Sequence, residues 1–239
     1  MQPLDLYQRV VLCPLRCTGI TNDPDNGRIP RSFYWGGDGR EVKLLLVSKN
    51  PGTAPSHELQ AYLQRPRETW AKVHYELTQD VFRGAKSVGT GYHVNLVKRV
   101  AAILGCEATA EAVFRESAMT ALVKCESAGA KTDKIPGETL TTCSTRFFYE
   151  ELELFKPVFL LALGSEVYRF LTRPEVAGRH SLPVGELYHP SWTNMKGGEA
   201  TYFRHVLPDV RAQYLQALAT RRRSANEQEK GPPNESPAA

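Results

Sequence analysis

Cysteine is the residue type whose spacing carries the most chemical information in this 239-residue sequence. Cys13 and Cys17 are separated by three residues, and Cys125 and Cys143 are separated by seventeen. Clustered thiolates bind zinc or an iron–sulphur cluster, and an odd total of five cysteines argues against a disulfide framework. The spacing fits neither ferredoxin pattern and does not by itself distinguish the two metals. Cys106 stands outside the pattern, and we expect it to be a small buried residue.

Polar side chains that follow predicted strands are the other candidates for chemistry. Four apolar runs are typical of strands: Val42–Ser48, Ala121–Lys124, Val158–Leu163 and the weaker Gly185–Tyr188. Asn50, Cys125 and His189 come directly after three of them. Because ligands bind at the carboxyl ends of parallel strands, these residues together form a stronger candidate site than any one alone. Ordinary turn chemistry also explains Asn50-Pro51-Gly52.

Helical periodicity fills the gaps between these strands. The predicted helices are Tyr92–Leu104, Thr145–Phe155, Ser165–Leu171 and about Thr201–Leu218. Strands that alternate with helices predict an α/β fold. We expect a three-layer α/β/α sandwich around a central, mostly parallel four-stranded sheet.

Composition indicates a globular protein, with 41% hydrophobic residues and a net charge of only +4. We predict a single domain over residues 1–221 and a disordered tail over 222–239, which is poor in hydrophobic residues. No apolar run is long enough to cross a membrane, and the start of the chain does not have the pattern of a signal peptide. We therefore expect a cytoplasmic protein, without membrane contacts and monomeric.

The ordered motifs resemble those of the uracil-DNA glycosylase superfamily, and in particular its iron–sulphur branches. The chain contains CPLRC at Cys13–Cys17, VSKNPG at Val47–Gly52, TALVKC at Thr120–Cys125, then Cys143, KPVFLLALG at Lys156–Gly164 and HPSW at His189–Trp192. Each motif is weak alone. Their order and rough spacing match the family from about Cys13 to Tyr214.

The resemblance implies a DNA repair enzyme of base excision repair, a hydrolase that flips a nucleotide out of DNA and cleaves its N-glycosidic bond. The expected substrate is uracil or a related deaminated base. Asn50 is then the residue that orients water, and His189 the residue that stabilises the departing base. The resemblance further implies a structural [4Fe–4S] cluster, with zinc as the alternative, on the four patterned cysteines. It assigns base or DNA contacts to Lys49, Gly52, Tyr92, Ser191 and Lys196.

Three departures from the family pattern keep other hypotheses open. Lys49 replaces the glutamate of the iron–sulphur branches, and the Asn-Pro-Gly ending resembles the mismatch-specific and single-strand-selective branches. Ala121 replaces the asparagine that reads uracil, which should reduce discrimination. The first cysteine pair has three intervening residues in place of two. A catalytically altered or inactive member that binds nucleic acid or nucleotide is the alternative function, and an unrelated zinc-stabilised α/β domain is a third.

Overall fold

The computed structural model describes residues 3–36, 41–82, 91–129, 134–189, 200 and 202–229. Within these residues, a five-stranded sheet has the order β2-β4-β3-β6-β7. Its strands are β2 (Tyr34–Trp35), β3 (Leu44–Ser48), β4 (Ser117–Ala121), β6 (Phe159–Leu163) and β7 (Val184–Leu187). The last four run parallel to their neighbours, and the short β2 pairs antiparallel with β4 at the edge. The predicted mostly parallel sheet is confirmed, with one additional edge strand.

Side chains of the central strands alternate between two hydrophobic cores, one on each face of the sheet. Leu45 and Val47 of β3 belong to one core, and Leu44 and Leu46 belong to the other. This alternation follows from the two-residue period of a pleated strand. Because β3 is buried on both faces, its sequence is a continuous apolar run instead of an alternating one.

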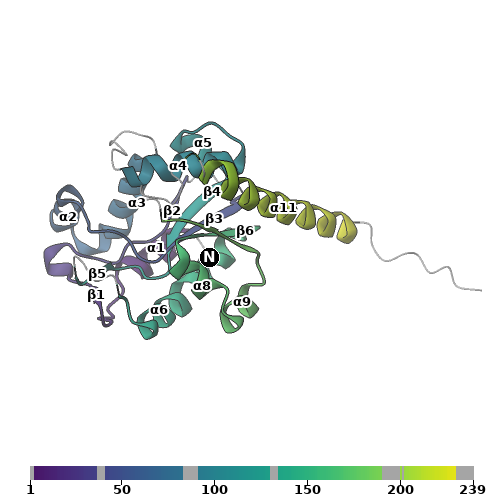
Figure 1. Ribbon diagram of the computed structural model, residues 1–239. Helices are drawn as coiled ribbons and strands as arrows, with labels where there is room; N and C mark the ends of the chain where they lie inside the picture. The colour runs from purple at the N-terminus through teal and green to yellow at the C-terminus, as the bar shows by residue number, and fades with distance from the viewer. Residues whose placement is uncertain are drawn as a thin grey trace, which may run out of the picture.

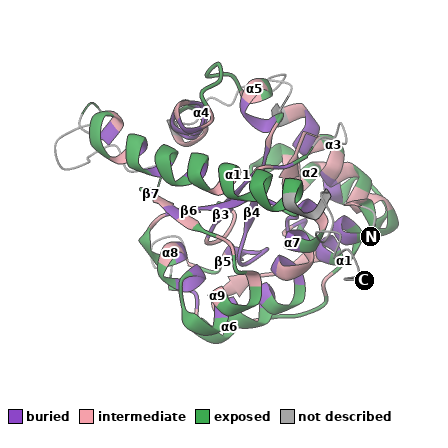
Figure 2. Ribbon diagram, turned by 90° about the vertical axis from the view of Figure 1, so that its right-hand side faces the viewer, coloured by how far each residue is buried: buried purple, intermediate pink, exposed green. Residues whose placement is uncertain are grey.

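Helices cover both faces, as Figures 1 and 2 show. One face carries α4 (Gly91–Leu104), α5 (Ala110–Phe114) and α11 (Leu207–Glu229). The other carries α1 (Pro3–Val11), α3 (Trp70–Phe82), α6 (Gly137–Cys143), α7 (Tyr149–Phe155), α8 (Ser165–Leu171) and α9 (Pro174–His180). Helix α2 (Ser56–Leu63) packs beside α3, and a separate antiparallel ribbon pairs β1 (Ile20–Thr21) with β5 (Glu126–Ser127). The three-layer arrangement is as predicted.

Short non-α turns join several of these helices. Two are 3₁₀ turns, Pro24–Asn26 and Arg67–Thr69. Two are π-helical, Ser144–Phe148 and Tyr202–Val206. The first π-helical turn connects α6 directly to α7, so the predicted helix Thr145–Phe155 is in fact π-helical in its first part.

The predicted strand Ala121–Lys124 is misplaced, because β4 ends at Ala121. Leu122 and Val123 are fully buried, which explains why they read as a strand. The sequence of β4 itself, Ser-Ala-Met-Thr-Ala, lacks the large apolar residues on which the prediction relied. The last strand is shifted by one residue, to Val184–Leu187.

The last helix is longer than predicted. Helix α11 continues to Glu229, so residues 222–229 are helical and not disordered, as Figure 1 shows. Every residue from 219 to 226 is exposed. Arginine, glutamine, glutamate and alanine are good helix formers, which favours a helix in this exposed segment. Residues 230–239 of the predicted tail lie outside the described residues.

No helix of the described chain is both long enough and apolar enough to span a bilayer.

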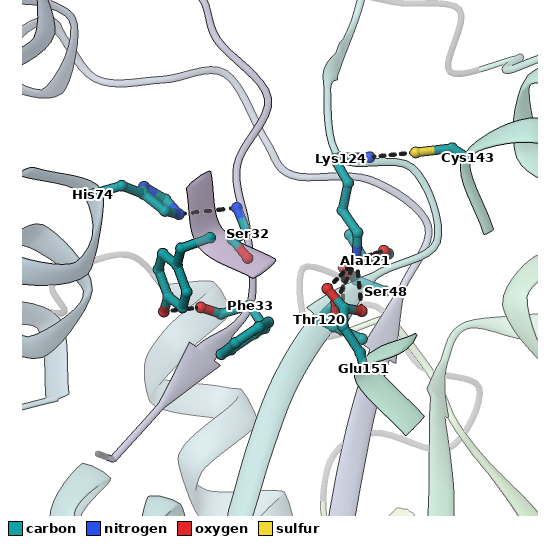
Figure 3. A network of polar contacts seen from close by, with 10 residues as sticks. Ser32, Phe33, Ser48, His74, Thr120, Ala121, Lys124, Cys143 and Glu151 are labelled. Carbon is teal, nitrogen blue, oxygen red and sulfur yellow. Dashed lines mark hydrogen bonds and ion pairs between the residues drawn. The ribbon is translucent and has the colours of Figure 1, made fainter. Parts of the chain in front are cut away.

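A buried histidine on α3 supports the segment that leads into β2. The backbone N–H of Ser32 donates to His74 Nε2 at 2.9 Å, as Figure 3 shows, and His74 Nδ1 lies 2.8 Å from Tyr62 Oη. Because Nε2 accepts, the neutral ring carries its hydrogen on Nδ1 and donates it to Tyr62. Burial, and secondly the positive charge of Arg31, lower the pKa of His74 to about 3.

Because the pKa of His74 is lowered in the folded protein, we expect the free energy of unfolding to decrease as the pH decreases. The ordinary pKa of 6.5 applies to the unfolded chain, which binds a proton below that pH, whereas the folded protein resists protonation down to about pH 3. Stability is therefore fully present above pH 6.5 and is lost progressively towards pH 3. Between pH 8 and pH 5 the loss from this residue is roughly 2 kcal/mol. Chemical denaturation of the wild type and His74→Gln measures it, and equal pH slopes would contradict it.

Candidate active site and cysteine site

The loop that follows β3 carries the first candidate residues. Asn50 is half-buried, and its side-chain Nδ2 donates to the carbonyl of Pro51 at 2.9 Å. This contact ties the amide to its own turn and leaves Oδ1 as its hydrogen-bond acceptor. We call residues 49–54 the β3 loop.

An ion pair connects the β3 loop to the end of β6. Lys49 Nζ lies 3.0 Å from Glu166 Oε2, in the first turn of α8. Gly164, between β6 and α8, has a φ of 110°, a conformation that favours glycine, and its N–H donates to the carbonyl of Leu187 at 2.7 Å. The position that a Gly164 Cβ would occupy is 3.8 Å from His189 Cβ. The ends of β3, β6 and β7 therefore meet beside one another.

His189 follows β7 at this edge, and its side chain is exposed beside the ring of Tyr92. The rings of Tyr92 and His189 have centroids 5.4 Å apart. Arg99 donates to the carbonyl of Tyr188 at 3.2 Å, and the Tyr188 N–H donates to Tyr202 Oη at 3.1 Å. Burial raises the pKa of Tyr92, so its hydroxyl stays neutral. The backbone just before His189 is therefore held on both sides.

The structure brings most of the predicted active-site residues to the same edge of the sheet. Asn50, Lys49 and Gly52 share the β3 loop, and Tyr92 and His189 are neighbours. Ser191 and Lys196 lie outside the described residues.

The four patterned cysteines line a single small pocket. Cys125 and Cys143 are buried, and Cys13 and Cys17 are half-buried. Burial raises the pKa of Cys125, and the neighbouring Cys143, Cys13 and Cys17 raise it further. Burial also raises the pKa of Cys143, to about 11. The four sulphur atoms thus influence one another although they come from distant parts of the sequence.

Cysteine thiols are chemically suitable ligands for a metal cofactor. A bound cation reverses the unfavourable burial of thiolates, because a coordinating thiol is deprotonated. A single ion needs ligands that converge to about 2.3 Å from one point. No three or more cysteine, histidine, aspartate or glutamate side chains in the described ranges converge in this way.

Secondary structure holds the two halves of the cysteine site together. In the β1–β5 ribbon Thr21 is the partner of Glu126, which places the segment after Cys17 beside Cys125. Thr139 of α6 donates to the Thr18 carbonyl at 2.9 Å. Cys143 is the last residue of α6. The N-terminal segment is therefore attached to the later cysteine segment by backbone pairing.

Sequence reasoning missed the charged residues that surround both sites. The missed set is Arg28, Arg31, Glu58, Lys124, Glu126, Glu151 and Glu166. Four pairs among them, and the pair of Glu166 with Lys49, join residues far apart in the chain, so no local pattern reveals them. The position of Glu126 directly after Cys125 was the one available signal. The expected burial of Cys106 is wrong: it is exposed, because it follows Gly105 at the surface end of α4.

Comparison with known families places the chain in a class. The family model of the Uracil DNA glycosylase superfamily matches residues 36–211, well over half of the chain. The chain therefore belongs to the uracil DNA glycosylase superfamily. The matched range includes Asn50, His189, Cys125 and Cys143, whereas Cys13 and Cys17 precede it. None of the curated proteins compared with the sequence matches it.

We expect Cys143→Ala to abolish metal binding, because it removes one of four donors. Anaerobically purified protein should lose a broad absorption band near ~400 nm, which a closed-shell zinc ion would not give. Cys106→Ser is the matched control and should keep both the band and the metal content. Zinc in a colourless wild-type protein would contradict the iron–sulphur assignment, and an unchanged band in Cys143→Ala would contradict the ligand set.

Proposed function

We propose that this protein is a DNA glycosylase that hydrolyses the N-glycosidic bond of uracil or a related deaminated base after flipping the nucleotide from the stack. The observation that supports it most is the meeting of the β3 loop with His189 through Lys49, Glu166 and Gly164 in a member of this superfamily. Base flipping is required because the scissile bond cannot be reached inside a duplex.

In this proposal Asn50 and His189 act on opposite ends of the breaking bond. The C1′–N bond breaks with its electron pair on the base, and His189 stabilises that charge by a hydrogen bond. Water held by Asn50 Oδ1 forms the new C1′–O bond, and its proton ends on the released base or on solvent. An amide is no general base, so Asn50 contributes by orientation.

The Lys49–Glu166 pair fits this chemistry. Glycoside cleavage passes through a sugar with positive character, which an uncompensated lysine beside Asn50 would disfavour. Glu166, 3.0 Å from Lys49, offsets that charge. The Lys49–Glu166 pair therefore carries almost no net charge at the position where the iron–sulphur branches have a glutamate.

Ala121 affects which base the site prefers. It is the register partner of Ser48 at the carboxyl ends of β4 and β3, and it carries no hydrogen-bonding side chain. A site without this amide cannot discriminate uracil by hydrogen bonding there, because only a donor or acceptor left unpaired rejects the wrong base. We propose a broader substrate range among deaminated bases.

The cysteine site has a structural role in this proposal. A [4Fe–4S] cluster takes one thiolate at each of its corners, so its ligands surround a space. Cys13, Cys17, Cys125 and Cys143 line one small pocket, which supports the proposal that they act together. When bound, the cluster supplies a covalent connection between the N-terminal segment and the segment after β4. The reacting groups remain Asn50 and His189.

Base release from oligonucleotides that contain uracil, xanthine, hypoxanthine or mismatches tests the activity. Asn50→Ala and His189→Ala should each lower single-turnover base release by about 10²- to 10³-fold, the range for removing one transition-state contact. DNA affinity should change little, because these residues act mainly in the transition state. Release at wild-type rates by both variants, or no release by wild-type protein that contains its metal, would count against the proposal.

The variant Lys49→Ala tests the expected contact between Lys49 and DNA. Because Lys49 pairs with Glu166 in the absence of DNA, it contacts a phosphate only by exchanging that partner, and Lys49→Ala should then weaken DNA binding and reduce the salt dependence of binding by about one phosphate contact. Lys43→Ala is a matched control, because Lys43 precedes β3 and pairs with Glu116 at 2.9 Å at the opposite edge of the sheet. Equal salt slopes for Lys49→Ala and the wild type would remove Lys49 from the DNA contacts.

A nucleic-acid-binding protein with altered chemistry is the second candidate. Lys49 in place of an acid and Ala121 in place of an amide favour it. DNA binding without base release on the whole substrate panel would support this candidate over the glycosylase.

A further inference from the structure

The β3 loop is fixed at its start by the segment that continues from β4. The N–H groups of Leu122 and Val123 donate to the carbonyls of Ser48 and Lys49, each at 2.9 Å. Ser48 Oγ donates to the Thr120 carbonyl at 3.1 Å. Two backbone hydrogen bonds thus join the segments beyond the end of β4, at Leu122 and Val123, just before Lys124.

The buried side chain of Lys124 fixes this segment, as Figure 3 shows. Its Nζ lies 2.7 Å from each of Glu151 Oε1, Thr120 Oγ1 and the Ala121 carbonyl. Lys124 is 1% exposed and Glu151 is fully buried. Two buried charges that satisfy each other permit little movement, because separation leaves each without compensation.

Glu126 fixes the other end of the loop. Its Oε2 accepts the N–H of Ala54 at 3.0 Å, and its Oε1 lies 2.8 Å from Arg28. The Arg31 guanidinium donates to the carbonyl of Gly52 and lies 3.9 Å from Glu126. The backbone N–H of Arg31 donates to the backbone carbonyl of Lys124 at 2.7 Å. The start of the β3 loop is therefore attached to Leu122 and Val123, and its end is attached to Glu126.

Cys125 lies between these two contacts. The backbone N–H of Lys124 donates to Cys143 Sγ at 3.3 Å, and Glu126 belongs to the β1–β5 ribbon that follows Cys17. Of the two neighbours of Cys125, Glu126 therefore contacts the loop that carries Asn50, whereas the Lys124 side chain contacts Glu151 of α7 and Thr120 and Ala121 of β4. A displacement of Cys125 would move Glu126, which accepts the hydrogen bond from Ala54 at the end of that loop.

We propose that Lys124 and Glu126 are positioning residues for Asn50, and that through them the order of the cysteine site sets the geometry of the β3 loop. This inference rests on the proposed glycosylase function. Neither residue needs to touch substrate. A misplacement of about 1 Å in a reacting group can cost on the order of 10²-fold in rate, so weakening this attachment reduces catalysis without removing a reacting group.

Glu126→Ala tests the attachment at the end of the loop. We expect kcat to fall by about 10- to 100-fold with little change in KM or in metal content. Amide hydrogen exchange of residues 49–54 should become at least about tenfold faster, because a charged hydrogen bond to Ala54 is lost. Glu126→Gln keeps an acceptor for that N–H and should restore part of both. Glu116→Ala, which removes the surface pair with Lys43 at the opposite edge, should change neither.

The double variant Lys124→Met with Glu151→Gln tests the start of the loop. It removes both buried charges together, which preserves folding better than leaving one charge unpaired. We expect the same faster exchange and the same selective fall in kcat as in Glu126→Ala.

Amide hydrogen exchange of the β3 loop and base-release activity distinguish the positioning proposal from the glycosylase proposal. Faster loop exchange in Glu126→Ala supports the positioning role even if the wild type releases no base, an outcome that defeats only the glycosylase proposal. Unchanged exchange overturns the positioning role. Loss of metal from Glu126→Ala also overturns it, because Glu126 would then act on the cysteine site and not on the loop.

Discussion

A lysine side chain buried beside Cys125 has to be neutralised inside the protein, and much of the carboxyl edge of the sheet depends on this constraint. Removing an ammonium and a carboxylate from water costs several kcal/mol per ion. Lys124 and Glu151 offset the cost only because four contacts at 2.7 Å satisfy the ammonium. Those contacts fix α7 against β4, with Thr120 held between them. Burial raises the pKa of Glu151, and the charge of Lys124 opposes that shift.

From this pair the arrangement extends to the proposed chemistry. The two backbone hydrogen bonds beyond β4 place the start of the β3 loop, and the loop brings Lys49 to Glu166 on α8. Gly164 then lets His189 approach the same edge. None of these steps needs a side chain in an unusual state. Parallel strands end together, and residues that follow them are close by topology.

The sequence was informative where burial dictates composition and uninformative where charges pair across the fold. The apolar runs at β3 and β6 predicted the parallel sheet, and turn residues after them predicted the position of Asn50. The polar sequence of β4 gave no such signal, and helix propensity alone extends α11. Arg31 and Glu126 contribute through contacts between segments distant in the chain, which local patterns do not encode. The grouping of the four cysteines around one pocket agrees with the spacing argument, whereas the metal stays a prediction.

The proposed positioning of Asn50 requires that disorder at the cysteine site also disorders the β3 loop. Amide hydrogen exchange of metal-loaded protein before and after anaerobic chelation tests it most directly. Faster exchange confined to the cysteine segments and to residues 49–54, with α4 unchanged, is the predicted result. Loss of metal with unchanged exchange in residues 49–54 would contradict the claim.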